Sequence, residues 1–363
     1  MNDSSTALLL SGGVDSSVAL HLLVEKGIRP DLFYIRIGAD EEGFEGCSQE
    51  DDEVIVRWLA RKYGLRLELV SLHQEYWDYV VRYMIDTVRG GRTPHPDMLC
   101  NRVIKFGYFN EYWGKDYDHI ATGHYADKVI EGGLHYLATA TDKTKDQTDF
   151  LAQITYPQLR KALFPLGRLP KTEVREIAEK EGLVTAHRRD SQGICFLGKV
   201  NYNDFLKKYL GTRTGDIIEL ETGKKLGTHE GFWFHTIGQR KGLGLSGGPW
   251  FVVKKETDTN TIFVSQGYDP EEQYGDIVEM SEMNFISGSP FPEGGTELNV
   301  TFKVRHTPEF GSGTLVRESD GSCVLYADEL IQGIAPGQFC SLYDKKSRIC
   351  YGSGVISGGR RQA

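Results

Sequence analysis

The stretch Leu8–Ser17, with the sequence LLLSGGVDSS, constrains the fold of this chain more than any other. The apolar run from Ala7 to Leu10 predicts a buried strand, and the two glycines after Ser11 allow a turn that side chains would block. A helix is expected from about Asp15, with Gly27 as its end. A strand, a glycine turn and a helix N-terminus together present backbone N–H groups to an anion such as phosphate.

The side chains of this loop add to that chemistry. Ser11, Ser16 and Ser17 supply hydroxyl donors, and Asp15 is suited to orient a magnesium ion carried by phosphates. The loop is not a Walker A loop, because no lysine follows the glycines, and it is not G-x-G-x-x-G. The pattern S-G-G-x-D-S resembles the PP-loop of ATP pyrophosphatases, which cleave ATP between the α and β phosphates. The alternative is a glycine turn that only closes a strand–helix unit.

The first half of the chain alternates strand and helix patterns. Strands are predicted over 32–37, 67–72 and 119–122, and helices over 54–63, 76–88, 100–113 and 171–181, the last with Thr172 as a candidate cap. Repeated β–α units predict an α/β fold with a doubly wound parallel sheet and helices on both faces. Ligands of such sheets bind beyond the carboxyl ends of the strands, which places Ser11–Ser17, the region after Ile35, and Gly123-His124 around one crevice.

The pattern changes after about Gly211. Short β-like runs separated by Gly, Asp and Asn replace the helical periods, which predicts a small mixed segment followed by an antiparallel β-barrel. The 363 residues are long enough for three domains. We place these domains at 1–205, 206–274 and 275–363.

Composition excludes some classes of protein. The chain is 39% hydrophobic and 26% charged, as in an ordinary soluble protein. The N-terminus lacks a basic segment followed by an apolar one, so we expect no signal peptide. No apolar run is long enough for a membrane span, and we expect a cytoplasmic location. The net charge of −9 argues mildly against nucleic acid, although basic pairs such as Arg188-Arg189 occur.

Six cysteines in such a chain do not indicate a disulfide scaffold. Cys100 is expected where a proline-rich loop meets a helix N-terminus, a position that lowers the pKa of a thiol. Cys195 lies beside arginines in RRDSQGICFLGK. For either cysteine alone, an inert buried position is the alternative. We expect core positions for three further cysteines in β-like runs, at 323, 340 and 350, and leave Cys47 open.

A metal site is not expected, because no C-x-x-C occurs and the histidines lack ligand spacing. Asp97, His124 and Asp146 are polar groups near the predicted crevice, where a carboxylate can act as acid or base, although such Asp residues often just cap turns. The segment from Lys145 to Gln147 is suited to a polyanion or to the end of a hairpin. The segment from Gly227 to Leu243 mixes rings and cations, which fits either stacked RNA bases or a hairpin with a packed aromatic centre.

Seven motifs, in this order, resemble the bacterial tRNA-specific 2-thiouridylases (MnmA/TrmU family): SGGVDSS, TPHPDMLCNRVIKFG, ATGHYA, KDQTDFL, DSQGICFLGK, HTIGQRKGL and APGQ. The resemblance spans nearly the whole chain. It implies a PP-loop domain, a small central domain that contacts tRNA, and a C-terminal β-barrel. It also implies a tRNA-uridine 2-sulfurtransferase, which uses ATP and Mg²⁺ to replace the C2 oxygen of the wobble uridine (position 34) in tRNAs for Lys, Glu and Gln.

The resemblance also implies roles for residues. Cys195 would carry a persulfide, Cys100 would be its partner nucleophile, and Asp97 would be the acid or base; a transient Cys100–Cys195 disulfide would then need a reductant. The persulfide would come from a cysteine desulfurase or a sulfur-relay protein. ATP would be held by Leu9, Leu10, Ser11, Gly12, Gly13, Val14, Asp15, Ser16, Ile35 and Gly123. The tRNA would be contacted by His95, Pro96, Asp97, His124, Lys145, Asp146, Gln147, Arg305, His306 and Gln338.

The sequence departs from the family at two positions: His95 stands where Asn is usual, and Asp127 where Arg is common. Rival functions remain at this stage. A PP-loop ligase that adenylates a small substrate would need no paired cysteines, and a tRNA-binding protein without catalysis would need no intact loop. A thiolase acting on another RNA base is a further alternative.

Overall fold

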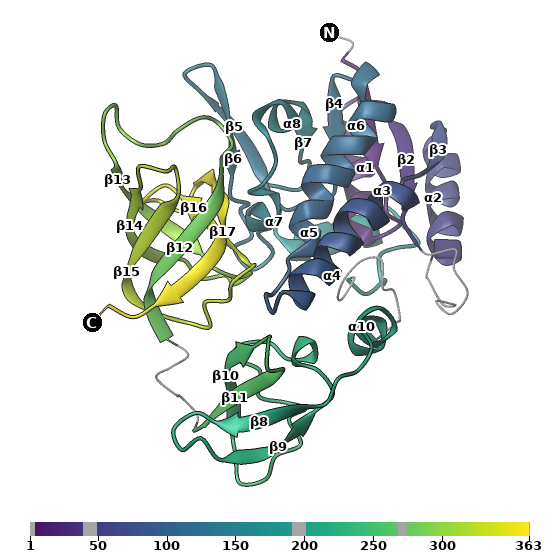
Figure 1. Cartoon of the computed structure of the whole chain (residues 1–363). Coiled ribbons are helices and arrows are strands. Elements are labelled where there is room, and N and C mark those ends of the chain that lie inside the picture. Colours follow the sequence, from purple (N-terminus) through teal and green to yellow (C-terminus); the bar gives the residue numbers. More distant parts are fainter. Residues whose placement is uncertain (1–3, 39–48, 191–200, 268–273, 363) are drawn as a thin grey trace.

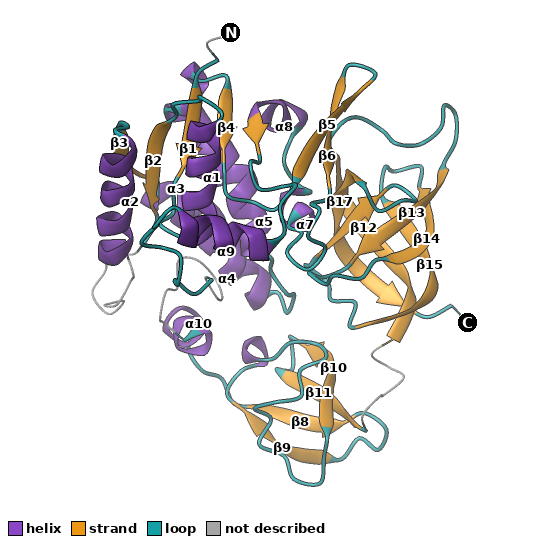
Figure 2. Cartoon of the chain, turned by 180° about the vertical axis from the view of Figure 1, so that it is seen from behind, coloured by secondary structure: helices purple, strands orange, loops and turns teal. Residues whose placement is uncertain are grey.

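The computed structural model describes residues 4–38, 49–190, 201–267 and 274–362. Figure 1 shows an N-terminal domain beside a C-terminal barrel, with a smaller central domain below them. Seen from behind, the N-terminal domain has helices in front of its sheet and behind it (Figure 2). The three-part architecture predicted from the sequence is therefore confirmed.

The N-terminal domain is built on a parallel sheet. Among the described residues five strands pair in the order β3-β2-β1-β4-β7, and all four pairings are parallel. The strands are β1 (Thr6–Leu9), β2 (Asp31–Arg36), β3 (Leu67–Ser71), β4 (His119–Ala121) and β7 (Ala162–Leu163). Alternate side chains of the first strand enter different cores, Ala7 and Leu9 on one face, Leu8 and Leu10 on the other. The doubly wound sheet is thus buried on both faces, as expected.

Helices cover each face. Val18, Leu59 and Val174 pack on the face of Leu8, while Val80, Ile104 and Phe109 pack on the face of Ala7. The first layer is α1 (Val14–Glu25), α2 (Gln49–Tyr63) and α9 (Lys171–Lys180). The second is α3 (His73–Glu75), the π-helix η1 (Tyr76–Val81), α4 (Arg82–Arg89), α5 (Pro96–Leu99), the π-helix η2 (Cys100–Tyr108) and α6 (Phe109–Tyr112). Shorter helices are η3 (Gly114–Asp116), α7 (Thr148–Leu151) and α8 (Tyr156–Lys161).

Several predicted helix ends are wrong, for physical reasons. The helix expected from Cys100 begins at Pro96, because proline is pre-organised for the first helical position and the His95 side chain accepts a bond from the Met98 N–H. Thr172 is not the cap of α9: the helix already includes Lys171, whose N–H donates to the Asp142 carboxylate at 2.8 Å.

The central domain is a small sheet with its own core. In the described residues its strands pair in the order β10-β11-β8-β9, around a core that includes Ile217, Phe232 and Val252. Helix α10 (Tyr202–Leu210) precedes it. The other elements are β8 (Gly215–Glu219), β9 (Lys225–His229), the 3₁₀-helix η4 (Phe232–Phe234), β10 (Trp250–Glu256) and β11 (Thr261–Gln266).

The C-terminal strands close into an antiparallel barrel. They pair in the order β12-β15-β14-β13-β16-β17, and β17 pairs back with β12. The strands are β12 (Tyr274–Phe285), β13 (Glu297–Lys303), β14 (Gly311–Arg317), β15 (Cys323–Gln332), β16 (Phe339–Tyr343) and β17 (Ile349–Arg360). Cys323 and Cys340 lie in the barrel core, and Cys350 lies in the core shared with the N-terminal domain, so the predicted burial of these three is confirmed.

A hairpin from the first half of the chain extends the barrel sheet, which was not predicted. It consists of β5 (Asp127–Glu131) and β6 (Leu134–Ala138), and β6 pairs with β17 through Leu137 and Ala138. Tyr343 and Cys350 of the barrel also join the apolar cluster that contains Leu137 and Phe109. The barrel and the N-terminal domain therefore share one continuous core.

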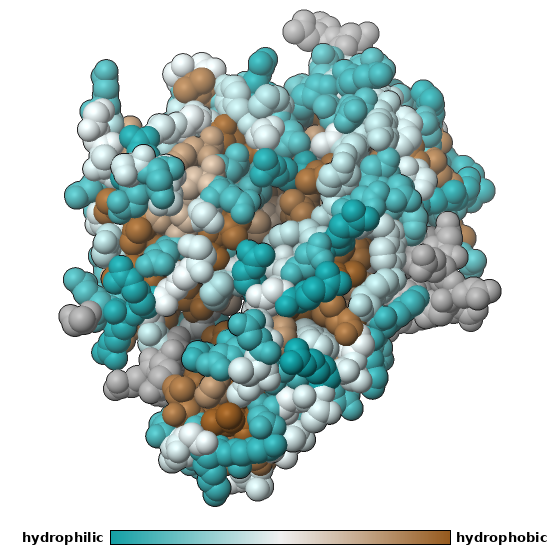
Figure 3. Space-filling view, viewed as in Figure 1, coloured by the Kyte–Doolittle hydropathy of each residue, from teal (hydrophilic) through white to brown (hydrophobic). Residues whose placement is uncertain are grey.

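Polar residues cover most of the face seen in Figure 3, and hydrophobic residues show between them in small patches on all three domains. Across the described segments, no helix has both the length and the apolar character that a membrane crossing needs.

Candidate functional site

The loop after β1 has the geometry expected of an anion site. Gly12 has φ = +78°, a conformation that favours glycine, and Gly13 caps α1. The Ser16 hydroxyl accepts from the Ser11 N–H at 3.2 Å and donates to the Gly13 carbonyl at 3.1 Å, while Ser17 donates to the same carbonyl at 2.8 Å. These bonds hold the loop in shape. The first N–H groups of α1 have no acceptor inside the helix, which leaves them for a ligand.

Gly123 explains why the neighbouring strand can lie so close to this loop. A Cβ atom at Gly123 would lie 2.8 Å from the backbone nitrogen of Ser16 and 3.0 Å from the carbonyl carbon of Asp15. Any side chain here would push the end of β4 away from the start of α1. β2, β1 and β4 are parallel neighbours and end at one edge of the sheet, where ligands of such sheets bind; the crevice at this edge stays a prediction.

A network of charges, which the sequence analysis did not find, surrounds Asp15. The Asp15 carboxylate accepts from Lys171 at 2.7 Å and from the Tyr125 hydroxyl at 2.8 Å. Lys171 also lies 2.8 Å from Asp190, which Lys145 contacts at 2.9 Å. Burial alone would raise the pKa of Asp190, but the bonds from Lys171 and Lys145 lower it to about 2. Asp190 therefore stays ionised and keeps these lysines in place.

A second cation lies against the glycine turn. Arg188 donates to the Gly12 carbonyl at 2.9 Å and pairs with Asp52 of α2. The carbonyl of Arg188 in turn accepts from Arg175 of α9. Arg188 and Arg189 were recognised in the sequence only as a basic pair, because the partners of Arg188 are distant in the chain.

These residues fit the phosphates of ATP with a magnesium ion. The free N–H groups and serine hydroxyls suit phosphate oxygens, Lys171 and Arg188 supply positive charge, and Asp15 supplies a carboxylate ligand for Mg²⁺. Leu9 and Leu10 are buried behind the loop, and Ile35 is half-buried in β2.

The proposed catalytic pair of Asp97 and Cys100 lies on the other layer of helices. Asp97 is half-buried in the first turn of α5, and Cys100 is buried at the first residue of the π-helix η2. Because the helix begins at Pro96, Cys100 lies in its second turn and not at its N-terminus. Widened π turns occur frequently at functional sites.

His95 is the N-cap residue of the helix that carries Asp97. Its ring packs edge-on against Phe150 and Phe339, with centroids 5.3 and 6.2 Å apart. Burial lowers the pKa of His95, although Asp97 and Asp149 oppose the effect. Its Nδ1 accepts from Met98, so the neutral ring keeps its proton on Nε2.

The barrel holds the loop before His95. The Thr93 N–H donates to the Pro336 carbonyl at 2.8 Å, and the Gln338 amide donates to the carbonyls of Thr93 and Pro94. A Cβ on Gly337 would lie 2.8 Å from the Thr93 oxygen. The APGQ motif therefore packs directly on the proposed catalytic loop, and the Gln338 amide is used there.

An electrostatic interaction between His124 and Lys105 relates the two predicted regions. Gly123 packs on Ser16, and the next residue, His124, has its pKa lowered well below the usual range by burial and by the charge of Lys105. Lys105 donates to Asn101, the neighbour of Cys100, at 2.9 Å. His124 Nδ1 lies 2.8 Å from the Thr122 hydroxyl.

Other predicted RNA contacts have partners within the protein. Asp146 is 2% exposed and accepts from the Ala140 N–H, from Thr148 and from Lys303. Gln147 accepts from the Tyr125 N–H at 3.0 Å. Together with the Lys145–Asp190 pair, these bonds make the KDQ segment part of the wall behind the phosphate loop.

Two residues after β13 lie at the surface. His306 lies 2.9 Å from Asp149 through Nδ1, and its ring packs on Phe150 with centroids 4.7 Å apart. Arg305 donates to the Gln332 carbonyl. Since Phe150 also contacts His95, the barrel and α7 border the entrance to the catalytic helix.

Cys195, Cys47 and the Cys100–Cys195 pairing lie wholly or partly outside the described residues. Within the described ranges, no cluster of three or more His, Cys, Asp or Glu side chains is placed to hold a metal ion.

Family models match the chain in three consecutive segments. These are the tRNA methyl transferase HUP domain over residues 4–199, the tRNA methyl transferase PRC-barrel domain over 203–266, and the aminomethyltransferase beta-barrel domain over 276–356.

Relatives that match over nearly the whole chain are named tRNA-specific 2-thiouridylases, which differs from the tRNA methyl transferase names of the first two family models. The chain is 57% identical over 351 residues to tRNA-specific 2-thiouridylase MnmA 1 of Bacteroides thetaiotaomicron, covering 97% of this chain and 99% of the relative. It is 58% identical over 354 residues to the MnmA of Parabacteroides distasonis, covering 96% and 98%. Among solved structures, the U34-tRNA thiolase NcsA from Methanococcus maripaludis matches with 23% identity and a TM-score of 0.35, over 58% of this chain and 68% of that one.

Proposed function

Since the chain belongs to the tRNA-specific 2-thiouridylase (MnmA) family, we propose that it is a tRNA sulfurtransferase that uses ATP to thiolate C2 of the wobble uridine, position 34, in tRNAs for Lys, Glu and Gln. The observation that carries this proposal is the pairing of two features: an intact phosphate loop at the edge of the parallel sheet, and a helix of the neighbouring layer that carries Asp97 and Cys100.

The first half of the reaction uses the phosphate loop. The C2 oxygen of uridine attacks the α phosphate of ATP, pyrophosphate leaves, and the oxygen becomes part of a good leaving group, AMP. Loop N–H groups and the hydroxyls of Ser11 and Ser16 would hold the phosphates, with Mg²⁺ near Asp15. Lys171 would stabilise the charge that develops on the departing pyrophosphate.

The second half uses the cysteines. In one route the terminal sulfur of a persulfide on Cys195 attacks C2, AMP departs with the former C2 oxygen, and Cys100 then attacks the Cys195 sulfur and breaks the S–S bond, which leaves the sulfur on C2. In the other route Cys100 attacks the Cys195 sulfur first and releases sulfide, which attacks C2 and displaces AMP. Both routes leave a Cys100–Cys195 disulfide, which a two-electron reductant returns to thiols. Asp97 would move the proton. A cysteine desulfurase or relay protein would supply the sulfur, in the cytoplasm.

The domain limits 1–205, 206–274 and 275–363 belong to the same proposal, with the central domain contacting tRNA. Helix α10 straddles the first limit and contacts both α4 and η4. The residues named for ATP and tRNA are likewise proposed, with one refinement. Asp146, Gln147 and Gln338 act chiefly by positioning, because their side chains already bind the protein.

The test is thiolation of an unmodified tRNA-Lys transcript with ATP, Mg²⁺ and a persulfide source, with 2-thiouridine and pyrophosphate both measured. We expect product from the wild type, loss of product in Cys100→Ser and Cys195→Ser, and continued pyrophosphate release in Cys195→Ser. Cys323→Ala, which alters a buried cysteine of the barrel, is the matched control and should retain activity.

Two outcomes would contradict the proposal. Pyrophosphate release that needs a small carboxylate substrate instead of tRNA would indicate a ligase. Binding of tRNA without release of pyrophosphate would indicate a binding protein.

A further inference from the structure

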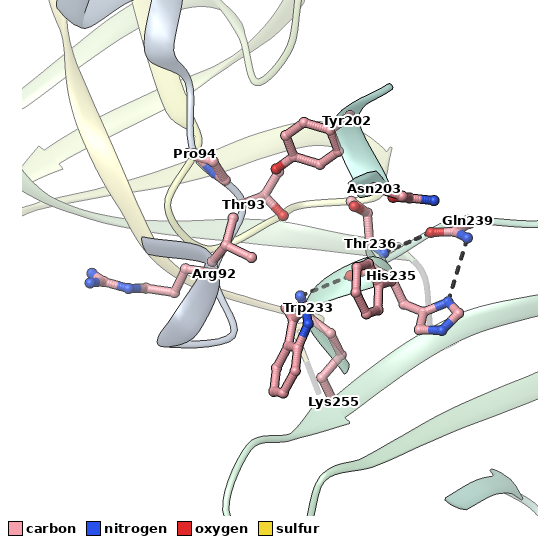
Figure 4. Close-up of a pocket in the computed structure, with 12 residues that line it drawn as sticks. Arg92, Thr93, Pro94, Tyr202, Asn203, Trp233, His235, Thr236, Gln239 and Lys255 are labelled. Carbon is pink, nitrogen blue, oxygen red and sulfur yellow. Dashed lines mark hydrogen bonds between the residues drawn. The ribbon is translucent and has the colours of Figure 1, made fainter. Parts of the chain in front are cut away.

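A pocket lies between the N-terminal and central domains, outside the site described above. It holds about 200 Å³ and is lined by the loop after α4, the start of α10, the η4 segment and β10 (Figure 4). Neither Asp97 nor Cys100 nor any residue of the phosphate loop lines it. The sulfur-transfer chemistry therefore takes place elsewhere.

The pocket is nevertheless adjacent to the proposed catalytic loop. Thr93 and Pro94 form part of its wall, and His95 to Asp97 follow directly in the chain. The barrel fixes this wall through Pro336 and Gln338. A group bound in the pocket would thus be held at a defined place relative to the target uridine.

The aromatic segment Phe232–Phe234 has two distinct roles. Phe232 is 3% exposed and packs in the core of the central domain. Trp233 and Phe234 are half-buried and pack against the core of the N-terminal domain, where they line the pocket with Tyr202. The packed-centre interpretation of this sequence therefore holds for Phe232, and the base-stacking interpretation stays a prediction for Trp233 and Phe234.

Two cations, Arg92 and Lys255, are among the residues that line the pocket. The Lys255 ammonium donates to the His235 carbonyl at 3.1 Å, which uses one of its three protons (Figure 4). Burial lowers the pKa of Lys255 to about 8, because it disfavours the charged ammonium. An anion bound beside Lys255 would stabilise that charged form. Among the described lining residues there is no carboxylate.

We propose that this pocket receives one unstacked base of the substrate RNA, a loop neighbour of the target uridine, with Lys255 facing its phosphate. The inference rests on the proposed RNA substrate and adds a second holding point for it. Aromatic walls bind bases by stacking, and a cation binds the backbone. The volume is below the roughly 300–1,000 Å³ of sites for whole small molecules, which suits a single base inserted from a polymer.

A matched pair of lysines tests the cation. Lys255→Gln should weaken binding of the tRNA about tenfold and reduce the dependence of affinity on salt by about one phosphate contact. Lys254→Gln should leave both unchanged, because Lys254 pairs with Glu256 and lies over Phe263, outside the pocket. Equal effects of the two changes would overturn the proposal.

A fluorescent base analogue tests the occupant. 2-Aminopurine is placed in turn at each loop position beside the target uridine of an anticodon stem-loop, and binding should quench one position strongly. Tyr202→Leu with Phe234→Leu should remove that quenching. An abasic nucleotide at that position should weaken wild-type binding severalfold and leave the double variant unaffected.

The remaining outcomes of these experiments distinguish failure of the pocket proposal from failure of the proposed function. If no position is quenched while wild-type enzyme still thiolates tRNA, the pocket proposal fails and the proposed function stands. If Lys255→Gln slows thiolation only when a sulfur-donor protein is present and leaves RNA affinity unchanged, the pocket receives the donor and the RNA assignment is wrong. Absence of thiolation by the wild type, with normal RNA quenching, would reject the proposed function alone.

Discussion

Lys171 connects the phosphate loop to the charge network behind it. Its ammonium lies between Asp15 of α1 and Asp190, and its side chain is 13% exposed. Two carboxylates hold it at the place where the phosphates of ATP would arrive. A cation held in advance stabilises a charged transition state without reorganising.

We therefore expect Lys171→Gln to slow pyrophosphate release about a hundredfold, since removal of one preorganised electrostatic contact typically costs 10²–10³ in rate. Lys171→Arg should recover part of the rate. Lys180→Gln, at the exposed other end of α9, is the control. The measurement is tRNA-dependent pyrophosphate release at saturating ATP, and an unchanged rate in Lys171→Gln would exclude this role.

The sequence predicted the loop but not its partners. Gly12, Gly13 and Ser16 could be recognised because a phosphate loop is a local pattern. Lys171 looked like one charge of an amphipathic helix, and Asp190 like part of a loop. Their contact with Asp15 depends on how α9 packs beside α1, and no local spacing encodes that packing.

Two buried histidines of the central domain flank η4: His229 ends β9, and His235 directly follows η4. Burial, together with His229 and Lys255, lowers the pKa of His235 from 6.5 to about 4. The unfolded chain therefore binds more protons than the folded one below pH 6.5. This contribution to stability is complete above that pH and is lost as the pH falls towards 4.

We expect His235 alone to lower the free energy of unfolding by about 2 kcal/mol when the pH is lowered from 7 to 5. His235→Asn should flatten that part of the pH dependence. His187→Gln, which changes an exposed histidine, should not. Urea unfolding followed by tryptophan fluorescence at both pH values gives the comparison, and parallel curves for wild type and His235→Asn would contradict the expectation.

Secondary structure was predicted where the pattern is local. The β–α alternation predicted β1, β2, β3 and β4 and their pairing as a parallel sheet, and the short β-runs indicated the barrel; β7 and the order of the strands in the sheet were not predicted. The π-helices η1 and η2 were missed, because a few wider turns do not alter the apolar spacing enough to be seen. The β5–β6 hairpin was also missed as a barrel element, since its partner strand is far along the chain.

At the scale of the whole molecule, a buried ion pair joins the barrel to the N-terminal domain. Lys303 of β13 and Asp146 are 1% and 2% exposed, and their charged atoms lie 3.4 Å apart. Lys303 also lies over the Phe310 ring at 4.3 Å. Burial raises the pKa of Asp146, although the Ala140 N–H, Thr148 and Lys303 act against it.

We expect Asp146→Asn to destabilise the protein by about 3–5 kcal/mol, because it leaves a buried ammonium without its counter-charge. Lys303→Met combined with Asp146→Asn should cost less than Asp146→Asn alone. Asp78→Asn, which breaks an exposed pair with Arg82, should cost about 1 kcal/mol or less. Unfolding in urea measures all three, and similar losses for Asp146→Asn and Asp78→Asn would show that the buried pair contributes little.

The pairing of β6 with β17 has a consequence for how the protein is made. A ribosome releases the hairpin long before β17, which starts 211 residues after the end of β6 (349 − 138). At a synthesis rate of about 5–20 residues per second, β6 is without its partner strand β17 for on the order of ten to forty seconds. The loop that carries Asp97 waits slightly longer for Gln338, which follows 241 residues later (338 − 97). A nascent chain can therefore fold its nucleotide loop early, but the site for RNA chemistry is completed only after Gln338 has been synthesised.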